Sequence, residues 1–123
     1  MRPRHTTRKR MIAVGLAAAT LGSLLAVSTP APAALNARII AGPGGFLPNG
    51  QYLTRVAVMQ KGGTALFTNL DIALHDVRSA RFSTPLVPFG KSKNVKGVSS
   101  LPKGNYAFKC SLHPWMVGAL RVI

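Results

Sequence analysis

The chain has 123 residues, with 16 Lys and Arg against 2 Asp and Glu, a formal net charge of +14 and a single cysteine. This length allows one small domain and excludes a multidomain enzyme, and a lone cysteine excludes a disulfide-stapled fold. Asp71 and Asp76 are the only side-chain carboxylates, so paired-carboxylate catalysis and calcium or magnesium cages have almost no ligands to draw on.

Residues 1–33 predict a secretory signal peptide. Residues 1–10 carry five basic side chains and no acidic one, and residues 11–29 carry no charge. The small-residue stretch APAA at 31–34 then provides a cleavage site. An uncleaved membrane anchor is the alternative, because the 19-residue apolar run approaches the length that spans a bilayer. In both cases we expect residues 34–123 to be exported, to the periplasm or another extracytoplasmic space.

The exported part remains strongly basic. Five of the positive charges lie in the leader, which leaves +9 of the +14 on residues 34–123. Exported proteins seldom meet nucleic acid, so we expect no nucleic-acid partner. The basic residues are spread out, with one denser stretch at 91–96 (KSKNVK). That stretch predicts a solvated loop or edge strand, or else a surface that steers the protein toward an acidic partner or an anionic membrane surface.

The exported part predicts an all-β domain. Past the leader, no window sustains the 3.6-residue apolar period of a helix, whereas short β-prone runs broken by Gly and Pro recur. Seven such runs in about 90 residues are typical of a two-sheet sandwich. In chain order, the predicted strands are 35–41, 52–59, 64–69, 75–80, 94–99, 105–110 and 117–123.

The sixth predicted strand places the lone cysteine inside the domain. Side chains alternate along a strand, so Tyr106, Phe108 and Cys110 share one face while Ala107 and Lys109 share the other. An unpaired cysteine is unusual in an exported protein. Three interpretations remain open at this point: an inert buried thiol, an intermolecular disulfide, or a metal thiolate.

The residues near this cysteine favour the metal thiolate. Cys110, His113 and Met116 are spaced C-x-x-H-x-x-M, and His75 lies 35 residues before Cys110 at another strand boundary. Two imidazoles and a thiolate with a weak axial thioether describe a blue-copper electron-transfer site. Zinc is the chief competitor, but it usually takes four firm N, S or O ligands and rarely a thioether. Together the four residues predict a site for one copper ion.

The sequence around these residues resembles the cupredoxins, or type 1 blue-copper proteins, over nearly all of residues 50–123. The segment 106–118 (YAFKCSLHPWMVG) is similar to the copper loop of amicyanin-type members. Upstream, 62–69 (GGTALFTN) with 75–77 (HDV) is similar to the strand and first-ligand motif of the family. The resemblance implies a Greek-key β-sandwich, one ion cycling between Cu(I) and Cu(II), and one-electron transfer without substrate turnover, so we expect no enzyme.

The resemblance also gives roles to neighbours of the ligands. Asp76 stands where Asn is common, so an ionised carboxylate there is expected to stabilise Cu(II) and lower the reduction potential. The backbone N–H of Asp76 is expected to donate to the cysteine sulfur, and Leu74 replaces a common Pro. We expect Ser111 to hydrogen-bond back to the first-ligand loop and Asn69 to brace that loop. Ordinary turn polarity is the alternative for both residues.

The resemblance places electron exit at the edge of His113. Leu112, His113, Pro114 and Trp115 are expected to form an apolar docking patch, to which the loop 46–48 is a candidate contributor; a core position is the alternative for Trp115. The sequence thus predicts an exported monomeric electron carrier with transient, acidic redox partners. A copper storage or delivery module for assembly of an exported copper enzyme is the alternative function. A purely adhesive sandwich leaves the C-x-x-H-x-x-M loop unexplained.

Overall fold

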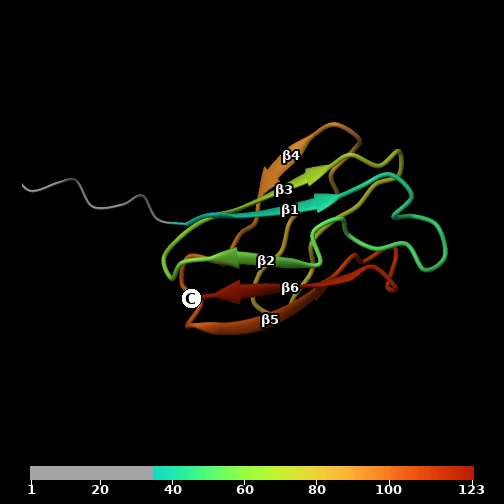
Figure 1. Ribbon diagram of the computed structural model, residues 1–123. Helices are drawn as coiled ribbons and strands as arrows, with labels where there is room; N and C mark the ends of the chain where they lie inside the picture. Colours follow the sequence, from blue (N-terminus) through green and yellow to red (C-terminus); the bar gives the residue numbers. More distant parts are fainter. Residues whose placement is uncertain (1–34) are drawn as a thin grey trace, which may run out of the picture. The chain divides into compact units, whose positions relative to one another are not determined.

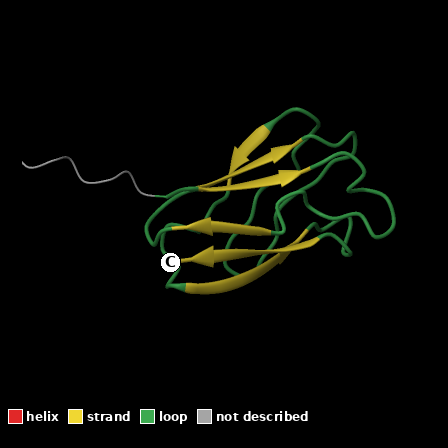
Figure 2. Ribbon diagram, viewed as in Figure 1, coloured by secondary structure: helices red, strands yellow, loops and turns green. Residues whose placement is uncertain are grey.

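Two three-stranded sheets face each other across a hydrophobic interior (Figures 1 and 2). The computed structural model describes residues 35–123, so the predicted leader at 1–33 lies outside the described residues. One sheet has the strand order β1-β3-β4 and the other the order β2-β6-β5. The strands are β1 (Ala37–Ala41), β2 (Val56–Met59), β3 (Ala65–Asn69), β4 (Ser92–Asn94), β5 (Gly104–Lys109) and β6 (Val117–Val122).

Both sheets mix parallel and antiparallel pairs. β1 pairs with β3 and β2 with β6 in parallel, whereas β3 pairs with β4 and β5 with β6 antiparallel. β1 and β2 are consecutive in sequence but lie in different sheets, which ties the two layers together. The predicted all-β sandwich is therefore confirmed. No helix within residues 35–123 is long and apolar enough to cross a membrane.

Three strand predictions need correction. The segment 75–80 is wrong as a strand, because it makes only isolated bridges and Val77 donates its N–H to the Thr84 hydroxyl. The strand predicted at 94–99 lies earlier, at Ser92–Asn94, and Gly97 takes a positive φ of 98° beyond it. The strand predicted at 52–59 begins only at Val56. Before that point, Leu53 and Thr54 both donate their N–H groups to the Ile40 carbonyl of β1 and form no ladder.

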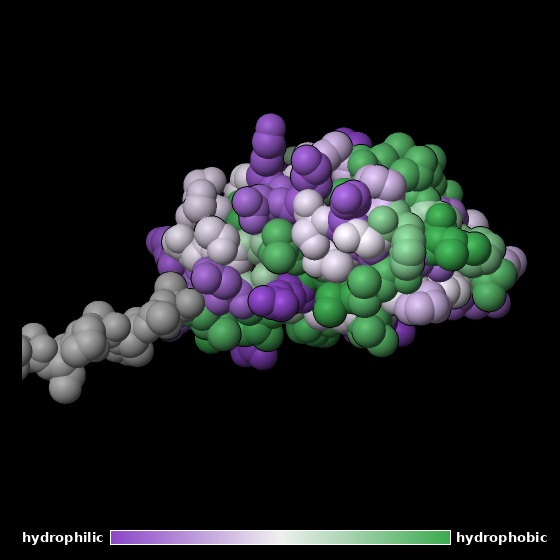
Figure 3. All heavy atoms as spheres, turned by 90° about the horizontal axis from the view of Figure 1, so that it is seen from above, coloured by the Kyte–Doolittle hydropathy of each residue, from purple (hydrophilic) through white to green (hydrophobic). Residues whose placement is uncertain are grey.

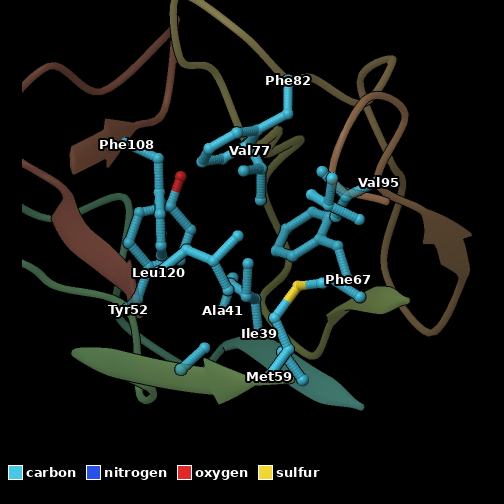
Figure 4. Close-up of a cluster of buried hydrophobic side chains, with 14 of the residues drawn as sticks. Ile39, Ala41, Tyr52, Met59, Phe67, Val77, Phe82, Val95, Phe108 and Leu120 are labelled. Carbon is cyan, nitrogen blue, oxygen red and sulfur yellow. The ribbon is translucent and has the colours of Figure 1, made fainter. Parts of the chain in front are cut away.

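The interior is filled by side chains from both sheets (Figure 4). Tyr52 is buried in it, with its ring edge-to-face against Phe67 at 6.3 Å and Phe108 at 5.0 Å between ring centroids. Its hydroxyl donates to the backbone carbonyl of Asp76, 2.5 Å away, so the core contacts the predicted first-ligand loop directly. Burial raises the pKa of Tyr52, which keeps the hydroxyl a donor. Packing of the core therefore fixes the segment that carries His75.

Gly118 provides space for one of these rings. It lies opposite Phe108 in the β5–β6 ladder, and a Cβ at this position would come within 2.5 Å of Phe108 Cζ. We expect Gly118→Ala to lower the free energy of unfolding by about 1–3 kcal/mol, the usual cost of overpacking. Urea denaturation of the copper-free wild-type and variant proteins measures this change in the free energy of unfolding.

A double variant separates this clash from a general effect of alanine in β6. Phe108→Leu removes the ring atoms that the new methyl group meets, so Gly118→Ala should cost less in that background. An equal cost in both backgrounds would contradict the steric explanation.

Candidate metal centre

The structure brings three of the four predicted ligands to one point at the end of the sandwich. His75 lies in the loop after β3, Cys110 directly follows β5, and His113 lies in the loop between β5 and β6. Their donor atoms all lie within 4.8 Å of one another. Cys110 Sγ is 3.6 Å from His75 Nδ1 and 3.5 Å from His113 Nδ1, and the two Nδ1 atoms are 3.1 Å apart.

These separations fit a single small ion. Nitrogen at about 2.05 Å and sulfur at about 2.3 Å from one ion in a trigonal plane lie about 3.6–3.8 Å apart. The observed triangle is slightly tighter than this. Cys110 and His75 are fully buried and His113 is half-buried, so the triangle has one open edge.

Met116 is the fourth predicted ligand and lies on the same loop. It is fully buried. Its backbone N–H donates to the His113 carbonyl at 2.8 Å, and its carbonyl accepts from the Cys110 N–H at 3.2 Å, which closes the loop on itself. Gly45 makes room for the side chain, since a Cβ there would lie 3.3 Å from Met116 Sδ and 3.0 Å from its Cε. A Cβ at position 45 would therefore press against the end of the Met116 side chain.

The local electrostatics suit a bound cation. Burial raises the pKa of the Cys110 thiol, while backbone N–H groups of Asp76, Leu112 and His113 act against that shift. Burial also lowers the pKa of His113, and the neighbouring His75 lowers it further, so the His113 imidazole is neutral and offers a lone pair. A cation that replaces the thiol proton would satisfy all of these groups together.

Asp71 sets the tautomer of His75. Its Oδ2 lies 2.6 Å from His75 Nε2, and both side chains are buried. Burial raises the pKa of Asp71, but hydrogen bonds from His75 and from the Gly44 N–H outweigh it and hold the pKa below its usual value. The ionised carboxylate accepts, so Nε2 carries the proton and Nδ1, which faces Cys110, keeps a free lone pair for a metal.

The same carboxylate joins two loops. Asp71 Oδ1 accepts from the Gly44 N–H at 3.0 Å, and Oδ2 accepts from the Phe46 N–H at 3.2 Å. Sequence reasoning counted Asp71 among the carboxylates but gave it no role. Its spacing of four residues before His75 is a signal that was present. The contacts with residues 44–46 leave no pattern in the sequence.

The residues expected beside the ligands also lie at the site. Asp76 Oδ1 accepts from the Ser111 N–H at 2.7 Å, and Oδ2 lies 2.6 Å from the Ser111 hydroxyl, which donates to it. Asn69 Nδ2 donates to the carbonyls of Ala73 and Val87, both at 2.7 Å, and its Oδ1 accepts from the Asp71 N–H at 2.8 Å. These bonds link the first-ligand loop to the cysteine loop on one side and to β3 on the other.

Apolar side chains surround the open edge of the site. Trp115 is 37% exposed, so the core alternative does not apply, and its ring lies edge-on to His113 with centroids 5.4 Å apart. Leu112 and Pro114 are exposed beside it. Hydrophobic side chains gather at the end of the molecule where these loops lie (Figure 3). Further exposed apolar residues from the neighbouring loops are Leu47, Leu70, Ile72, Leu74, Leu86 and Phe89.

Solved structures of copper proteins share this fold. A purple cupredoxin from Nitrosopumilus maritimus is 27% identical, with a TM-score of 0.62 over 71% of this chain and 99% of that chain. A reduced Cu(I) amicyanin variant is 19% identical, with a TM-score of 0.55 over 76% and 86%. A copper-containing nitrite reductase from Thermus scotoductus is 20% identical, with a TM-score of 0.53 over 80% of this chain but 24% of its own. No protein-family model and no curated protein sequence matches the chain.

The cupredoxin resemblance and the expectation of copper are thereby confirmed. His75, Cys110, His113 and Met116 are positioned to form a copper site. A copper ion bound there supplies one-electron redox chemistry. The protein's part is to hold two imidazoles and two sulfur atoms in place through buried, hydrogen-bonded loops.

Proposed function

We propose that this chain, which has the cupredoxin fold, is an exported type 1 blue-copper protein that carries single electrons between redox partners and catalyses no reaction of its own. The observation that supports this most is the buried triangle of Cys110 Sγ and two histidine Nδ1 atoms, with Met116 buried on the same loop. A half-buried His113 edge among exposed apolar side chains suits electron exit to a docked partner. The chain matches the nitrite reductase over 24% of that enzyme only, so the likeness covers the fold and not that whole enzyme.

A visible absorption spectrum tests the proposal. Residues 34–123 are purified, Cu(II) is added, and ascorbate is then added to reduce it. We expect intense absorption that bleaches on reduction and returns on oxidation, because a Cys–Cu(II) bond gives a strong charge-transfer band. A colourless protein that binds Cu(I) but not Cu(II) would favour storage or delivery, and one that binds neither would refute the copper function.

Met116→Leu tests the axial ligand. We expect the variant to keep copper and colour but to have a higher reduction potential, since loss of a donor weakens the hold on Cu(II) more than on Cu(I). A tenfold change in relative affinity corresponds to about 59 mV for one electron, and we expect a shift of at least about this size. Protein-film voltammetry measures it.

Met59→Leu is the matched control, because Met59 is also fully buried but lies in β2 of the core. Its potential should stay at the wild-type value. Equal potentials for both variants would remove Met116 from the ligand set.

We also propose transient partners with acidic surfaces. Every exposed charged side chain among the described residues is basic, since the two carboxylates are buried. We expect the second-order rate constant for reaction with an acidic redox protein to fall as salt rises from about 0.01 to 0.15 M, where the Debye length shortens from about 30 to 8 Å. Stopped-flow kinetics measures it, and a flat salt profile would make the basic surface incidental for that partner.

Export and the monomeric state belong to the same proposal. The basic, apolar and small-residue order of residues 1–34 supports export. Fractionation of cells that express the full chain would test it, and retention in the cytoplasm would contradict it.

A further inference from the structure

A second site lies beside β5. A cavity of about 340 Å³ opens between β5 and the segment 78–80. Its walls are mostly small or apolar, and two of its residues carry positive charge. The lining residues are Arg78, Ser79, Ala80, Ala107, Phe108, Lys109 and Val117. None of the predicted copper ligands is among them.

The backbone holds the two cations side by side. Arg78 and Lys109 form an isolated antiparallel bridge, with Arg78 N to Lys109 O at 2.8 Å and Lys109 N to Arg78 O at 3.0 Å. Side chains of such directly opposed residues leave the same face at about 5 Å between Cβ atoms. Like charges in this position repel each other. An anion placed between them would be attracted to both side chains and would offset their repulsion.

The carboxylates of the described residues do not fill this role. Asp71 is buried against His75, and Asp76 is buried against Ser111. Arg78 Nη2 makes one 3.3 Å contact with Asp76 Oδ2, and the Arg78 side chain is 51% exposed. A guanidinium has five N–H donors. One guanidinium nitrogen of Arg78 therefore contacts Asp76. Within residues 35–123, the other guanidinium N–H groups have no carboxylate partner and can donate to a bound ligand.

We propose that this cavity binds a ligand made of a carboxylate on a small apolar body, such as an aryl or branched alkyl group. Arg78 and Lys109 hold the carboxylate with charge-assisted hydrogen bonds. Ala80, Ala107 and Val117 contact the apolar body. A volume of about 340 Å³ lies at the lower end of the range for small-molecule sites, which suits one ring and a short chain. The proposal does not rest on copper, because the site is built from other residues.

Phenylacetate is the probe, with phenylacetamide as its neutral analogue and 2-phenylethylammonium as its cationic one. Amide NMR spectra of the full-length protein are recorded during each titration, in the Cu(I) form and the copper-free form, which are both diamagnetic. We expect phenylacetate to shift the amides of residues 78–80, 107–109 and 117 saturably, with affinity that falls as salt is added. Phenylacetamide should bind at least about tenfold more weakly.

Arg78→Gln and Lys109→Gln should each weaken phenylacetate about tenfold. Lys96→Gln is the matched control, since Lys96 lines a separate cavity of about 300 Å³, near β4, and should leave the affinity unchanged.

Three results would overturn the proposal: equal binding of the neutral analogue, shifts spread over all lysines, or full affinity in Arg78→Gln. A protein that fails the copper spectrum yet binds phenylacetate in this pattern would refute the proposed function and leave this site standing.

Discussion

Cys110→Ala is expected to bind Cu(II) only weakly and without intense visible absorption. The thiolate is the ligand that gives a blue-copper site its colour and much of its selectivity for copper. His75 and His113 keep their Nδ1 atoms in the variant, so weak, pale binding through imidazole remains. Wild-type protein should gain about 4 kcal/mol of unfolding free energy at a free copper concentration a thousand times the Kd, and the variant almost none at the same concentration.

Two controls distinguish loss of the copper ligand from loss of the fold. A buried thiol packs as a small hydrophobe, so copper-free Cys110→Ala should unfold at nearly the wild-type urea concentration. Cys110→Ser keeps the volume and offers a hydroxyl, yet should also lack the colour. A variant without the thiol that stays intensely coloured would refute a Cys–Cu(II) bond and the function built on it.

The parts that could be predicted from the sequence are those encoded locally. Alternation placed Phe108 and Cys110 on one inner face, and both are buried. The C-x-x-H-x-x-M spacing placed three candidate metal ligands, Cys110, His113 and Met116, on one loop. The fourth ligand, His75, was inferred from its residue type and its place at another strand boundary, and the fold places it beside them.

The parts that sequence reasoning missed depend on contacts between distant segments. Asp71 reaches the N–H groups of Gly44 and Phe46, which lie 27 and 25 residues away, and no periodicity records such a contact. The segment 75–80 reads as a strand by composition, but its N–H groups bond mostly to loop residues, and Arg78 alone donates to a strand residue, Lys109. The opposed pair of Arg78 and Lys109 exists only once β5 has met that segment.

Asp71→Asn is expected to weaken copper binding by about 10–100-fold, the usual effect of losing the carboxylate that orients a ligating histidine. The amide is neutral and its NH₂ group is a donor, so it cannot replace both acceptor oxygens. His75 loses a charge-assisted partner, and the N–H of Gly44 or Phe46 is left unpaired. Each buried donor left unpaired costs about 1–3 kcal/mol, so unfolding free energy should fall as well. Copper titration against a competing chelator measures the affinity.

The pH dependence of stability separates this role from a general packing defect. The folded pKa of Asp71 is lowered, so its contribution is complete above the unfolded value of about 3.9 and is lost as pH falls through the lower folded pKa. Copper-free wild-type protein should therefore lose stability on acidification in this range, and Asp71→Asn should lose less. The ring N–H of His75 should give a slowly exchanging NMR signal in the wild type that the variant lacks. An unchanged acid profile together with an unchanged ring signal would show that Asp71 does not set the tautomer of His75.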